Sequence, residues 1–264
     1  MRIVTLMENN TKDPRFCCEH GLSLYIETGK YKILFDAGQS ALFAENARML
    51  GVDLGEVDFA VLSHGHYDHS GGLRHFMRIN KKALVYVNRH AFQPHYNGAG
   101  KYIGVDPEGL DLSRIRYVDD EFEIDQGITL YSCNDRRTVV PADPFGQTVL
   151  EGDQYLPDDY RHEQYLLINE NGKKICFSGC SHKGILNIAH WFQPDYLIGG
   201  FHFMKIPTTE EGKTVLQDAA RVLLQGKTHY ITGHCTGSAQ YAVMEEVMKD
   251  RLQILFCGME IEID

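Results

Sequence analysis

The chain has 264 residues, of which 43% are hydrophobic. That fraction is enough for a sizeable buried core, so a disordered chain is excluded. The formal net charge of −10, without any run of Lys and Arg, argues against nucleic acid as the main ligand. No apolar stretch approaches the roughly 20 residues that span a bilayer, and the N-terminus lacks the apolar segment of a secretory signal, so we expect a cytoplasmic protein with no membrane partner.

The first half of the chain begins with a hairpin and continues with alternating strands and helices. Apolar runs at 22–28 and 31–38 flank Gly29-Lys30 and predict a β-hairpin. Ser40 is a suitable N-cap for a helix to about Leu50. Further expected elements are a strand at 58–63, a short helix from Leu73, and strands at 83–88 and 128–132. The segment 91–127 is irregular, and we expect strand edges, loops and a substrate-facing insertion there.

The second half repeats this order. Residues 134–160 are polar and contain three prolines, so we expect loops. Runs at 165–169 and 173–179 predict a second hairpin. The remaining expected elements are helices at 183–191, 209–225 and 238–249 and strands at 195–200, 228–232 and 252–256. No linker composition separates the halves, which favours a single α/β domain over residues 1–264.

The segment SHGHYDHSGG (63–72) carries the chemistry. His64 and His66 are two residues apart, so after a strand both rings point to the same side and can bind one cation. Asp68 and His69 follow on the next bend, where they can face a second cation. A solvated His-rich turn without metal is the alternative, but the buried strand before the motif and the glycines after it argue against that interpretation.

The HxHxDH pattern of this motif, directly after a hydrophobic strand, resembles the signature of the metallo-β-lactamase superfamily. The resemblance implies an αββα sandwich, with two mixed β-sheets and helices on the outer faces, around a two-metal site. Asp36, in ILFDAG (33–38), matches the family's carboxylate that orients a ligand histidine from behind. A simple turn residue before Gly38 is the alternative role for Asp36.

Two later clusters match positions at which the superfamily supplies further ligands. Cys180 in FSGCSHKG stands where a bridging Asp is usual, so either this thiol binds metal or His182 takes the role and Cys180 lines the pocket. A thiolate ligand would favour zinc. His234 in TGHCTG matches the late histidine of the second metal, and Cys235 is expected to be a packed thiol.

Several other polar residues are further candidates for the site. His162 is the best positional candidate for the ligand expected before the second hairpin, with Glu163 and Asp159 as rivals. His202 in GGFHF follows a strand and is a candidate ligand, general acid or oxyanion stabiliser, of which we prefer the last two. His90 and His95 are candidates for the cleft and His20 for its rim, whereas we expect structural roles for His75, His190 and His229. The seven cysteines, including the Cys17-Cys18 pair, are expected to be free thiols.

The motifs together, including EHGLSLYIET, GCSHKGI and IGGFHF, resemble one subgroup along almost the entire chain. This subgroup carries the label dihydropterin-methyl-aminobenzene-phosphate synthase. The resemblance implies two divalent metal ions, with zinc favoured and iron or manganese open. The implied function is a metal-dependent hydrolase in which metal-activated hydroxide attacks a small-molecule ester, phosphoester, thioester or lactone, with a pterin-related substrate as one option. Asp68 would anchor an ion and orient the hydroxide, and His202 would assist the leaving group.

Three alternatives stay open at this point. An iron-dependent thiol dioxygenase or other oxidoreductase shares the fold, although flavodiiron-type members usually carry Glu where this chain has His66. A nuclease is disfavoured by the acidic charge balance, and a non-catalytic metal-binding module is the third option.

Arg136-Arg137, with Lys183 and Lys205, would suit a phosphate, or the arginines would belong to a solvated loop. Phe92, Tyr96 and Tyr102 would stack on a planar ligand or pack on one another. The sequence predicts no oligomeric state.

Overall fold

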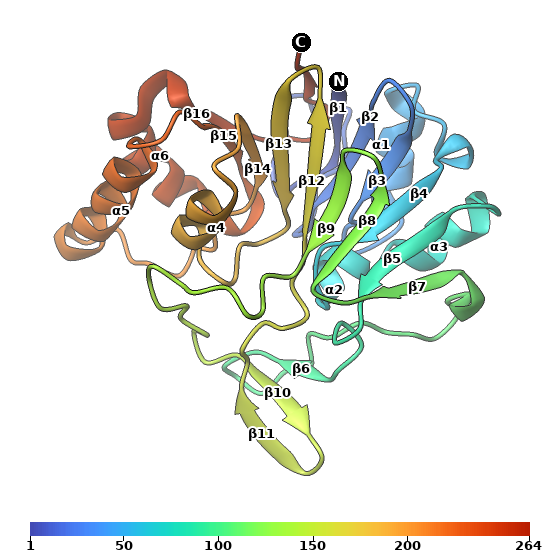
Figure 1. Cartoon of the computed structure of the whole chain (residues 1–264), viewed down its shortest axis with the longest axis horizontal. Helices are drawn as coiled ribbons and strands as arrows, with labels where there is room; N and C mark the ends of the chain where they lie inside the picture. The colour runs from blue at the N-terminus through green and yellow to red at the C-terminus, as the bar shows by residue number, and fades with distance from the viewer.

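Two seven-stranded sheets face each other in a computed structural model that describes all residues 1–264 (Figure 1). In sheet order, the first consists of β17 (Glu260–Glu262), β1 (Arg2–Met7), β2 (Ser23–Glu27), β3 (Lys32–Phe35), β4 (Phe59–Leu62), β5 (Leu84–Asn88) and β7 (Ile115–Val118). The second consists of β16 (Leu252–Ile254), β15 (His229–Thr232), β14 (Tyr196–Gly199), β13 (Lys173–Ser178), β12 (Tyr165–Glu170), β9 (Ile128–Tyr131) and β8 (Glu121–Asp125). Both sheets are mixed, since β3–β4–β5–β7 and β13–β14–β15–β16 are parallel and the other pairs are antiparallel.

The strands are apolar on both faces because both faces of each sheet are covered. In β3, Ile33 and Phe35 belong to the core between the sheets, whereas Leu34 faces the outer core. The same alternation in β12 places Leu166 between the sheets and Leu167 in the opposite outer core. Successive side chains of a strand point to opposite faces, so such continuous apolar runs are what a doubly covered sheet requires.

Helices cover the two outer faces. Those packed on the first sheet are α1 (Leu42–Met49) and α3 (Leu73–Ile79), preceded by the single turn α2 (Tyr67–Ser70). Those packed on the second sheet are α4 (Ile185–Phe192), α5 (Glu210–Leu223) and α6 (Ser238–Met248), at the left of Figure 1. The predicted αββα sandwich is therefore confirmed. None of these helices is both long enough and apolar enough to cross a membrane.

One edge of the sandwich gathers the ends of strands from both sheets. The parallel strands β3, β4, β13, β14 and β15 all end there, and β12, which runs antiparallel to β13, begins there. Each of these strand ends lies next to a residue singled out above: Asp36, His64, Cys180, His202, His234 and His162. The topology thus brings the scattered polar clusters to a common edge, as expected for sheets with loops at the carboxyl ends of parallel strands.

Several local expectations are wrong. The segment 134–160 contains a hairpin, β10 (Thr148–Glu151) and β11 (Gln154–Pro157), which pairs with β6 (His95–Tyr96) and projects at the bottom of Figure 1. Its strands lack a hydrophobic alternation because β11 is exposed along its whole length. Ala41 and not Ser40 directly precedes α1, but the Ser40 hydroxyl still accepts the N–H of Leu42 while it donates to Glu19, so Ser40 caps this helix one residue earlier than expected. The short strand β17 was not expected either.

The two glycines that end the HxHxDH motif are needed for close packing rather than for an unusual backbone angle. Gly71 and Gly72 have ordinary helical φ values of −62° and −78°. A Cβ atom at either position would lie 2.1 Å from a carbonyl oxygen, that of Gln39 or Ala37. The segment that carries the motif can therefore lie directly against the loop after β3, which contains Asp36.

Candidate metal centre

The histidines of the early motif meet a histidine from the second sheet. His64, His66 and His182 are all buried, and their ring centroids are 4.6 to 4.9 Å apart. Their donor nitrogens lie within 4.8 Å of one another. The Nε2 atoms of His64 and His66 and both ring nitrogens of His182 are buried without a hydrogen-bond partner. Buried polar atoms are nearly always paired, so these unpaired nitrogens mark a place for a ligand.

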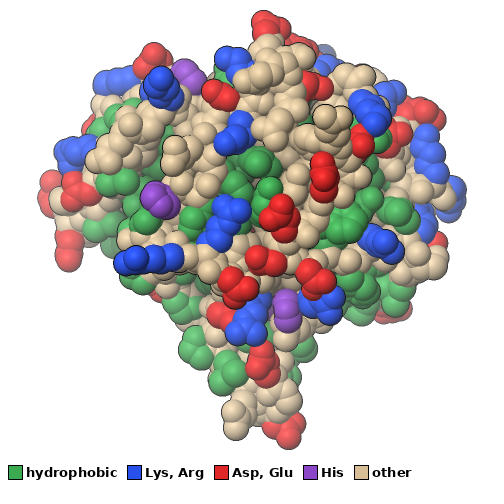
Figure 2. Space-filling view, viewed as in Figure 1, with side chains coloured by type: hydrophobic (Ala, Val, Ile, Leu, Met, Phe, Trp, Pro, Cys, Tyr) green, Lys and Arg blue, Asp and Glu red, His purple; other side chains and the backbone are tan.

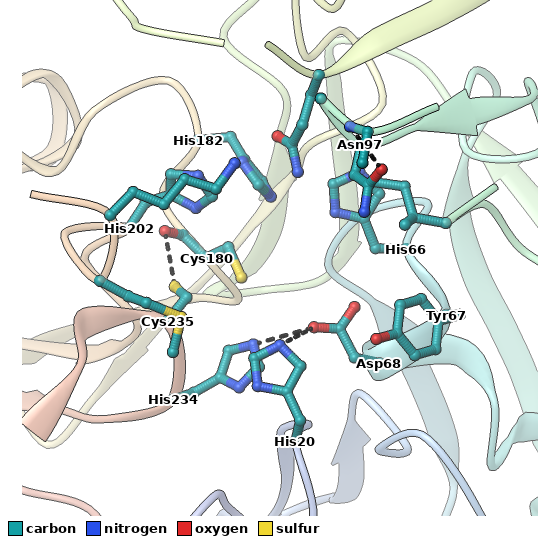
Figure 3. A pocket seen from close by; sticks show the side chains of 16 residues that line it. His20, His66, Tyr67, Asp68, Asn97, Cys180, His182, His202, His234 and Cys235 are labelled. Atoms are coloured by element: carbon teal, nitrogen blue, oxygen red, sulfur yellow. Dashed lines mark hydrogen bonds and ion pairs between the residues drawn. The ribbon is translucent and has the colours of Figure 1, made fainter. Parts of the chain in front are cut away.

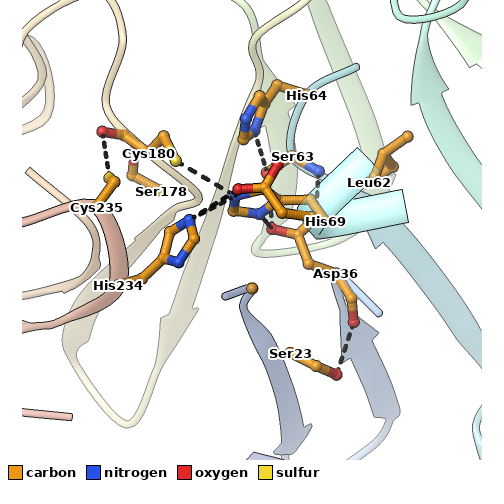
Figure 4. Close-up of polar contacts among 12 residues, drawn as sticks. Ser23, Asp36, Leu62, Ser63, His64, His69, Ser178, Cys180, His234 and Cys235 are labelled. Carbon is orange, nitrogen blue, oxygen red and sulfur yellow. Dashed lines mark hydrogen bonds and ion pairs between the residues drawn. The ribbon is translucent and has the colours of Figure 1, made fainter. Parts of the chain in front are cut away.

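A buried carboxylate fixes two rings of the motif from behind (Figure 4). Asp36 accepts hydrogen bonds from His69 Nδ1 and from the N–H and Oγ–H of Ser63, each at 2.7 Å. Because the Ser63 hydroxyl hydrogen is directed to Asp36, its oxygen accepts from His64 Nδ1 at 2.8 Å. Both imidazoles consequently carry a proton on Nδ1 and direct Nε2 to the cluster, and in the neutral His64 ring that nitrogen is a lone pair. The expected position of Asp36 behind the motif is what the structure shows.

A second group of donors surrounds His69. The Nε2 atom of His69 lies 3.1 Å from His234 Nε2, 3.3 Å from Cys180 Sγ and 3.9 Å from Asp68 Oδ2, and His234 Nε2 is 3.3 Å from that same Asp68 oxygen. Tetrahedral ligands at 2.0–2.1 Å from zinc are separated by roughly 3.3 Å. These four distances are therefore close to those between the ligands of one ion.

The hydrogen bonds of an asparagine in the N-terminal segment determine the tautomers of His234 and His20. The backbone N–H of Gly21 donates to Asn9 Oδ1, and Asn9 Nδ2 donates to the carbonyl oxygen of His234, so the amide orientation is set by backbone groups. Asn9 Oδ1 then accepts from His234 Nδ1 at 2.9 Å, which leaves His234 Nε2 as a lone pair. Asn9 Nδ2 donates to His20 Nδ1 at 3.2 Å, so His20 carries its proton on Nε2, which lies 3.2 Å from Asp68.

Nε2 of His69 faces Nε2 of His234 at 3.1 Å. Burial opposes protonation of His69, but Asp36 and Asp68 outweigh it and raise the pKa of this ring, so without an ion a proton on Nε2 joins the two rings. A divalent ion can take the place of that proton, because the other nitrogen of each ring is already bound, to Asp36 or to Asn9. The residues therefore fit a bound divalent ion on the chemistry of their own hydrogen bonds.

The protonation of the buried groups is consistent with this fit. Burial lowers the pKa of His64, His66 and His182 well below its usual value, so these rings are neutral, as metal ligands must be. Burial opposes ionisation of Asp68, but His69, His20 and His234 outweigh it, and the pKa of this carboxyl lies well below its usual range. Asp68 is therefore an anion in the middle of the histidines.

Two cysteines adjoin the cluster. Cys180 lies beside His69 as described, and burial raises the pKa of its thiol. A divalent ion at that place would favour the thiolate. Cys235, which we expected to be only a packed thiol, lines the same cavity and donates to the carbonyl oxygen of Cys180 at 3.4 Å. All seven cysteines are free, as expected.

His162 lies near the cluster, but its hydrogen bonds give it another task. The N–H of Gly65 donates to His162 Nδ1 at 2.8 Å, so the neutral ring carries its proton on Nε2, 3.4 Å from Asp158 Oδ2. The same oxygen accepts from His95 Nδ1 at 2.8 Å. In this arrangement His162 holds the backbone of the motif and has no free lone pair, although its Nε2 and that of His95 have no close hydrogen-bond partner and lie within 4.8 Å of donor atoms of His66 and Asp158. Metal binding by His162 stays a prediction that these hydrogen bonds do not favour.

The donors open into a cavity of about 360 Å³ (Figure 3). Asp68 and His20 lie on one side of it, and His182 and His202 on the other. The ring of His202 is 4.2 Å from that of His182, and neither of its nitrogens has a hydrogen-bond partner. The expected place of His202 beside the cluster is what the structure shows, and His20, which is exposed, reaches Asp68 from the rim of the cavity as expected.

The charged residues expected to serve as rival ligands or phosphate contacts lie elsewhere, with one exception. Glu163 accepts from the backbone N–H groups of His182 and Lys183 and thereby holds this loop. Lys183 is buried and donates to Ser132 and Asn134, and Arg136 stacks on Tyr131 and Phe192. Asp159 is exposed and pairs with Arg161. Lys205 alone among the basic side chains lines the cavity.

The remaining candidates have structural surroundings. Tyr96 packs on Tyr102 and Tyr155, and Phe92 packs on Tyr117, so these rings satisfy one another. The residues that lie outside the cavity lining are His75, His90, His190 and His229. Sequence reasoning missed Glu8, Asn9, Ser63 and Asp158. Of these, only Asp158 had a usable signal, since it stands four residues before His162 in a polar segment.

Comparison with known proteins identifies the family. Residues 18–150, half of the chain, match the metallo-beta-lactamase superfamily, and the chain belongs to it. It is 31% identical to the uncharacterized protein MJ0448 of Methanocaldococcus jannaschii, with 77% of this chain and 80% of that protein covered.

Two further relatives cover nearly the whole chain. The 7,8-dihydropterin-6-methyl-4-(beta-D-ribofuranosyl)-aminobenzene-5'-phosphate synthase of the same organism is 29% identical, with 95% and 92% covered. The crystal structure of Tm1679, described as a metal-dependent hydrolase of the beta-lactamase superfamily, superposes with a TM-score of 0.80 at 26% identity and covers 100% of this chain and 99% of that one. The predicted family and the resemblance to the pterin-related synthases are thus confirmed.

Proposed function

We propose that this protein is a metal-dependent hydrolase that uses two divalent ions to cleave a small-molecule ester, thioester, lactone or phosphoester. The observation that carries the proposal is the set of buried ring nitrogens without a hydrogen-bond partner on His64, His66 and His182, in the same cluster as the anionic Asp68. The description of Tm1679 as a metal-dependent hydrolase supports it.

The donors divide into two sets. His64, His66 and His182 would hold one ion. His69, His234 and Asp68 would hold the other, with Cys180 adjoining both sets. Histidine and thiolate donors favour zinc over harder ions, with iron or manganese as alternatives. When bound, such ions supply Lewis acidity and bring the pKa of a water molecule towards neutrality.

The residues around the ions would then position the reactants. Asp68, held by His20, accepts a hydrogen bond from the attacking water and orients it. His202 has both ring nitrogens free toward the cavity and would donate a proton to the leaving group or a hydrogen bond to the developing oxyanion. Lys205 is the one Lys or Arg side chain in the cavity lining, so it would be the cationic contact for a substrate anion.

A pterin-related substrate is suggested only by the name of the synthase relative. The aromatic side chains that we expected to stack on such a ligand pack on one another instead. Lys, Arg, Asp and Glu are intermingled on the face shown in Figure 2, which supports a small molecule rather than a nucleic acid as the substrate. The class of cleaved bond therefore has to come from an activity screen.

The test compares metal-free and zinc-loaded protein on esters, thioesters, lactones and phosphoesters, together with metal analysis. We expect two ions per chain and hydrolysis that disappears on chelation and returns with zinc. The variant His64→Gln should lose both, whereas His190→Gln, on the outer helix α4, should keep both. Undiminished hydrolysis by the chelated protein or by His64→Gln would refute the proposal.

A further inference from the structure

A second cavity adjoins the donor cavity at His182 and His202, which line both. It has a volume of about 400 Å³ and lies between the loop at 140–145 and helices α4 and α5. We name it the apolar recess, because most of its lining is hydrophobic. Its hydrophobic side chains include Val140, Phe145, Ile185, Phe203, Val215 and Ala219. Its volume is in the range of cavities that take small ligands.

The recess leaves apolar surface in contact with water. Val215 and Val222 lie about two helical turns apart on α5. Their side chains are 51% and 46% exposed although both line the recess. Covering such side chains with an apolar group is favourable by roughly 25 cal/mol per Å². The imidazoles of His182 and His202, with no protein partner for their nitrogens, form the boundary between this apolar surface and the donors. A single molecule can therefore reach both cavities.

Charge restricts what enters the recess. Its only charged lining residues are Asp143 and Asp218, so a carboxylate or phosphate there would meet like charge. On the donor side, Lys205 is the single basic side chain, and burial lowers its pKa. One such cation is a poor match for a polyphosphate, whose recognition usually relies on several basic groups or on bidentate Arg.

From this we propose that the substrate is an ester or thioester whose uncharged, apolar acyl chain lies in the recess, with its carbonyl group among the donors. This assignment rests on the hydrolase function proposed above. Water adds to the acyl carbon, and the bond from that carbon to oxygen or sulfur breaks. One proton of the water, passed on by His202, goes to the departing alkoxide or thiolate, and the other is released to solvent as the acyl product ionises to a carboxylate. The apolar chain fixes the carbonyl beside His182 and His202 without any charged anchor.

The kinetic test uses p-nitrophenyl octanoate and p-nitrophenyl acetate with the zinc-loaded protein. We expect kcat/KM for the octanoate to exceed that for the acetate by about tenfold or more, because chain burial adds binding. Ala219→Phe fills the recess and should abolish this preference while leaving kcat/KM for the acetate within about twofold. Thr214→Phe adds the same ring to an exposed position of α5 outside the recess and should behave as the unmodified protein.

A binding measurement accompanies the kinetics. The uncharged dye N-phenyl-1-naphthylamine should bind saturably to the unmodified protein and to Thr214→Phe, and about tenfold more weakly to Ala219→Phe. Equal dye binding by all three proteins, or an unchanged chain preference in Ala219→Phe, would overturn the acyl assignment while hydrolysis of the acetate stands. If neither ester is cleaved, the assignment fails, and lack of activity on the whole substrate panel would remove the hydrolase function too.

Discussion

The two walls of the donor cavity are built differently. On one wall, formed by the first sheet, the N-terminal segment and the turn after β15, His64, His69 and His234 each have Nδ1 bound to a defined acceptor, and each presents Nε2. On the opposite wall, His182 and His202 have no hydrogen-bond partner on either nitrogen. The first wall is therefore fixed before any ion binds, whereas the second has rings whose orientation only an ion or a substrate can set.

This difference indicates that the first wall binds the metal ions and the second contacts the substrate. Ligands whose tautomer and rotation are set by a carboxylate bind metal more tightly than free ones, because less order is lost on binding. Rings without partners can instead adapt to a substrate, and the apolar recess begins beside them. We therefore expect changes on the first wall to affect stability and metal affinity, and changes on the second to affect turnover.

The largest effect should come from His69→Leu. It removes the imidazole that pairs with the buried Asp36 and leaves that carboxylate only the two uncharged hydrogen-bond donors of Ser63, which costs about 3–5 kcal/mol of unfolding free energy. Zinc affinity should fall by more than about 100-fold. Chemical denaturation and zinc titration measure the two losses. The double variant Asp36→Leu/His69→Leu should be less destabilised than the sum of the single variants, and simple additivity would contradict the pairing.

Asp36→Asn should have the next largest effect. An amide nitrogen cannot accept from His69 or Ser63, so the ring orientations behind the ligands are lost. We expect zinc affinity to drop by about 10- to 100-fold, the range found for partners of metal-binding histidines. Asp58→Asn, which alters an exposed carboxylate that accepts the N–H of Lys32, is the matched control. Unchanged affinity in Asp36→Asn would show that the carboxylate only supports the fold.

Asn9→Asp tests the opposite tautomers of His20 and His234. The second carboxylate oxygen accepts where Asn9 Nδ2 donates, so His20 must move its proton to Nδ1 and present a lone pair to Asp68. We expect about a tenfold loss of zinc affinity or less. Imidazole ¹⁵N shifts of the metal-free protein should show Nε2–H for His20 and Nδ1–H for His234 before the change, and Nδ1–H for both after it. Identical tautomers in the unmodified protein would contradict the assignment.

Much of the first wall could be predicted from the sequence because it is local. The spacing of His64, His66, Asp68 and His69 after a buried strand places them together, and Asp36 ends the neighbouring parallel strand. The strands that carry the late histidines are apolar runs of the same kind. These elements depend on residues close in the chain, so their pattern is visible without tertiary structure.

The rest depends on contacts between distant segments. Asn9 and Glu8 reach His234, more than 220 residues later, only because the loop after β1 packs against the turn after β15. His162 stands at the right place in the chain, yet the N–H of Gly65 takes its lone pair, which no periodicity reveals. The hairpin of β10 and β11 was missed because its exposed strand has no buried face to impose an alternation.

The smallest effect on stability and metal affinity should come from His202→Gln. The ring nitrogens of His202 have no hydrogen-bond partner to lose, and the ring packs beside those of His182 and Phe145, so we expect unfolding free energy within about 0.5 kcal/mol of the unmodified protein and unchanged zinc content. Turnover should nevertheless fall by about 100-fold, since a positioned proton donor typically contributes that much. Steady-state kinetics on the best ester and metal analysis of the same sample separate the two effects. A loss of zinc together with activity would place His202 among the ligands, and the two walls would then no longer differ in the way described.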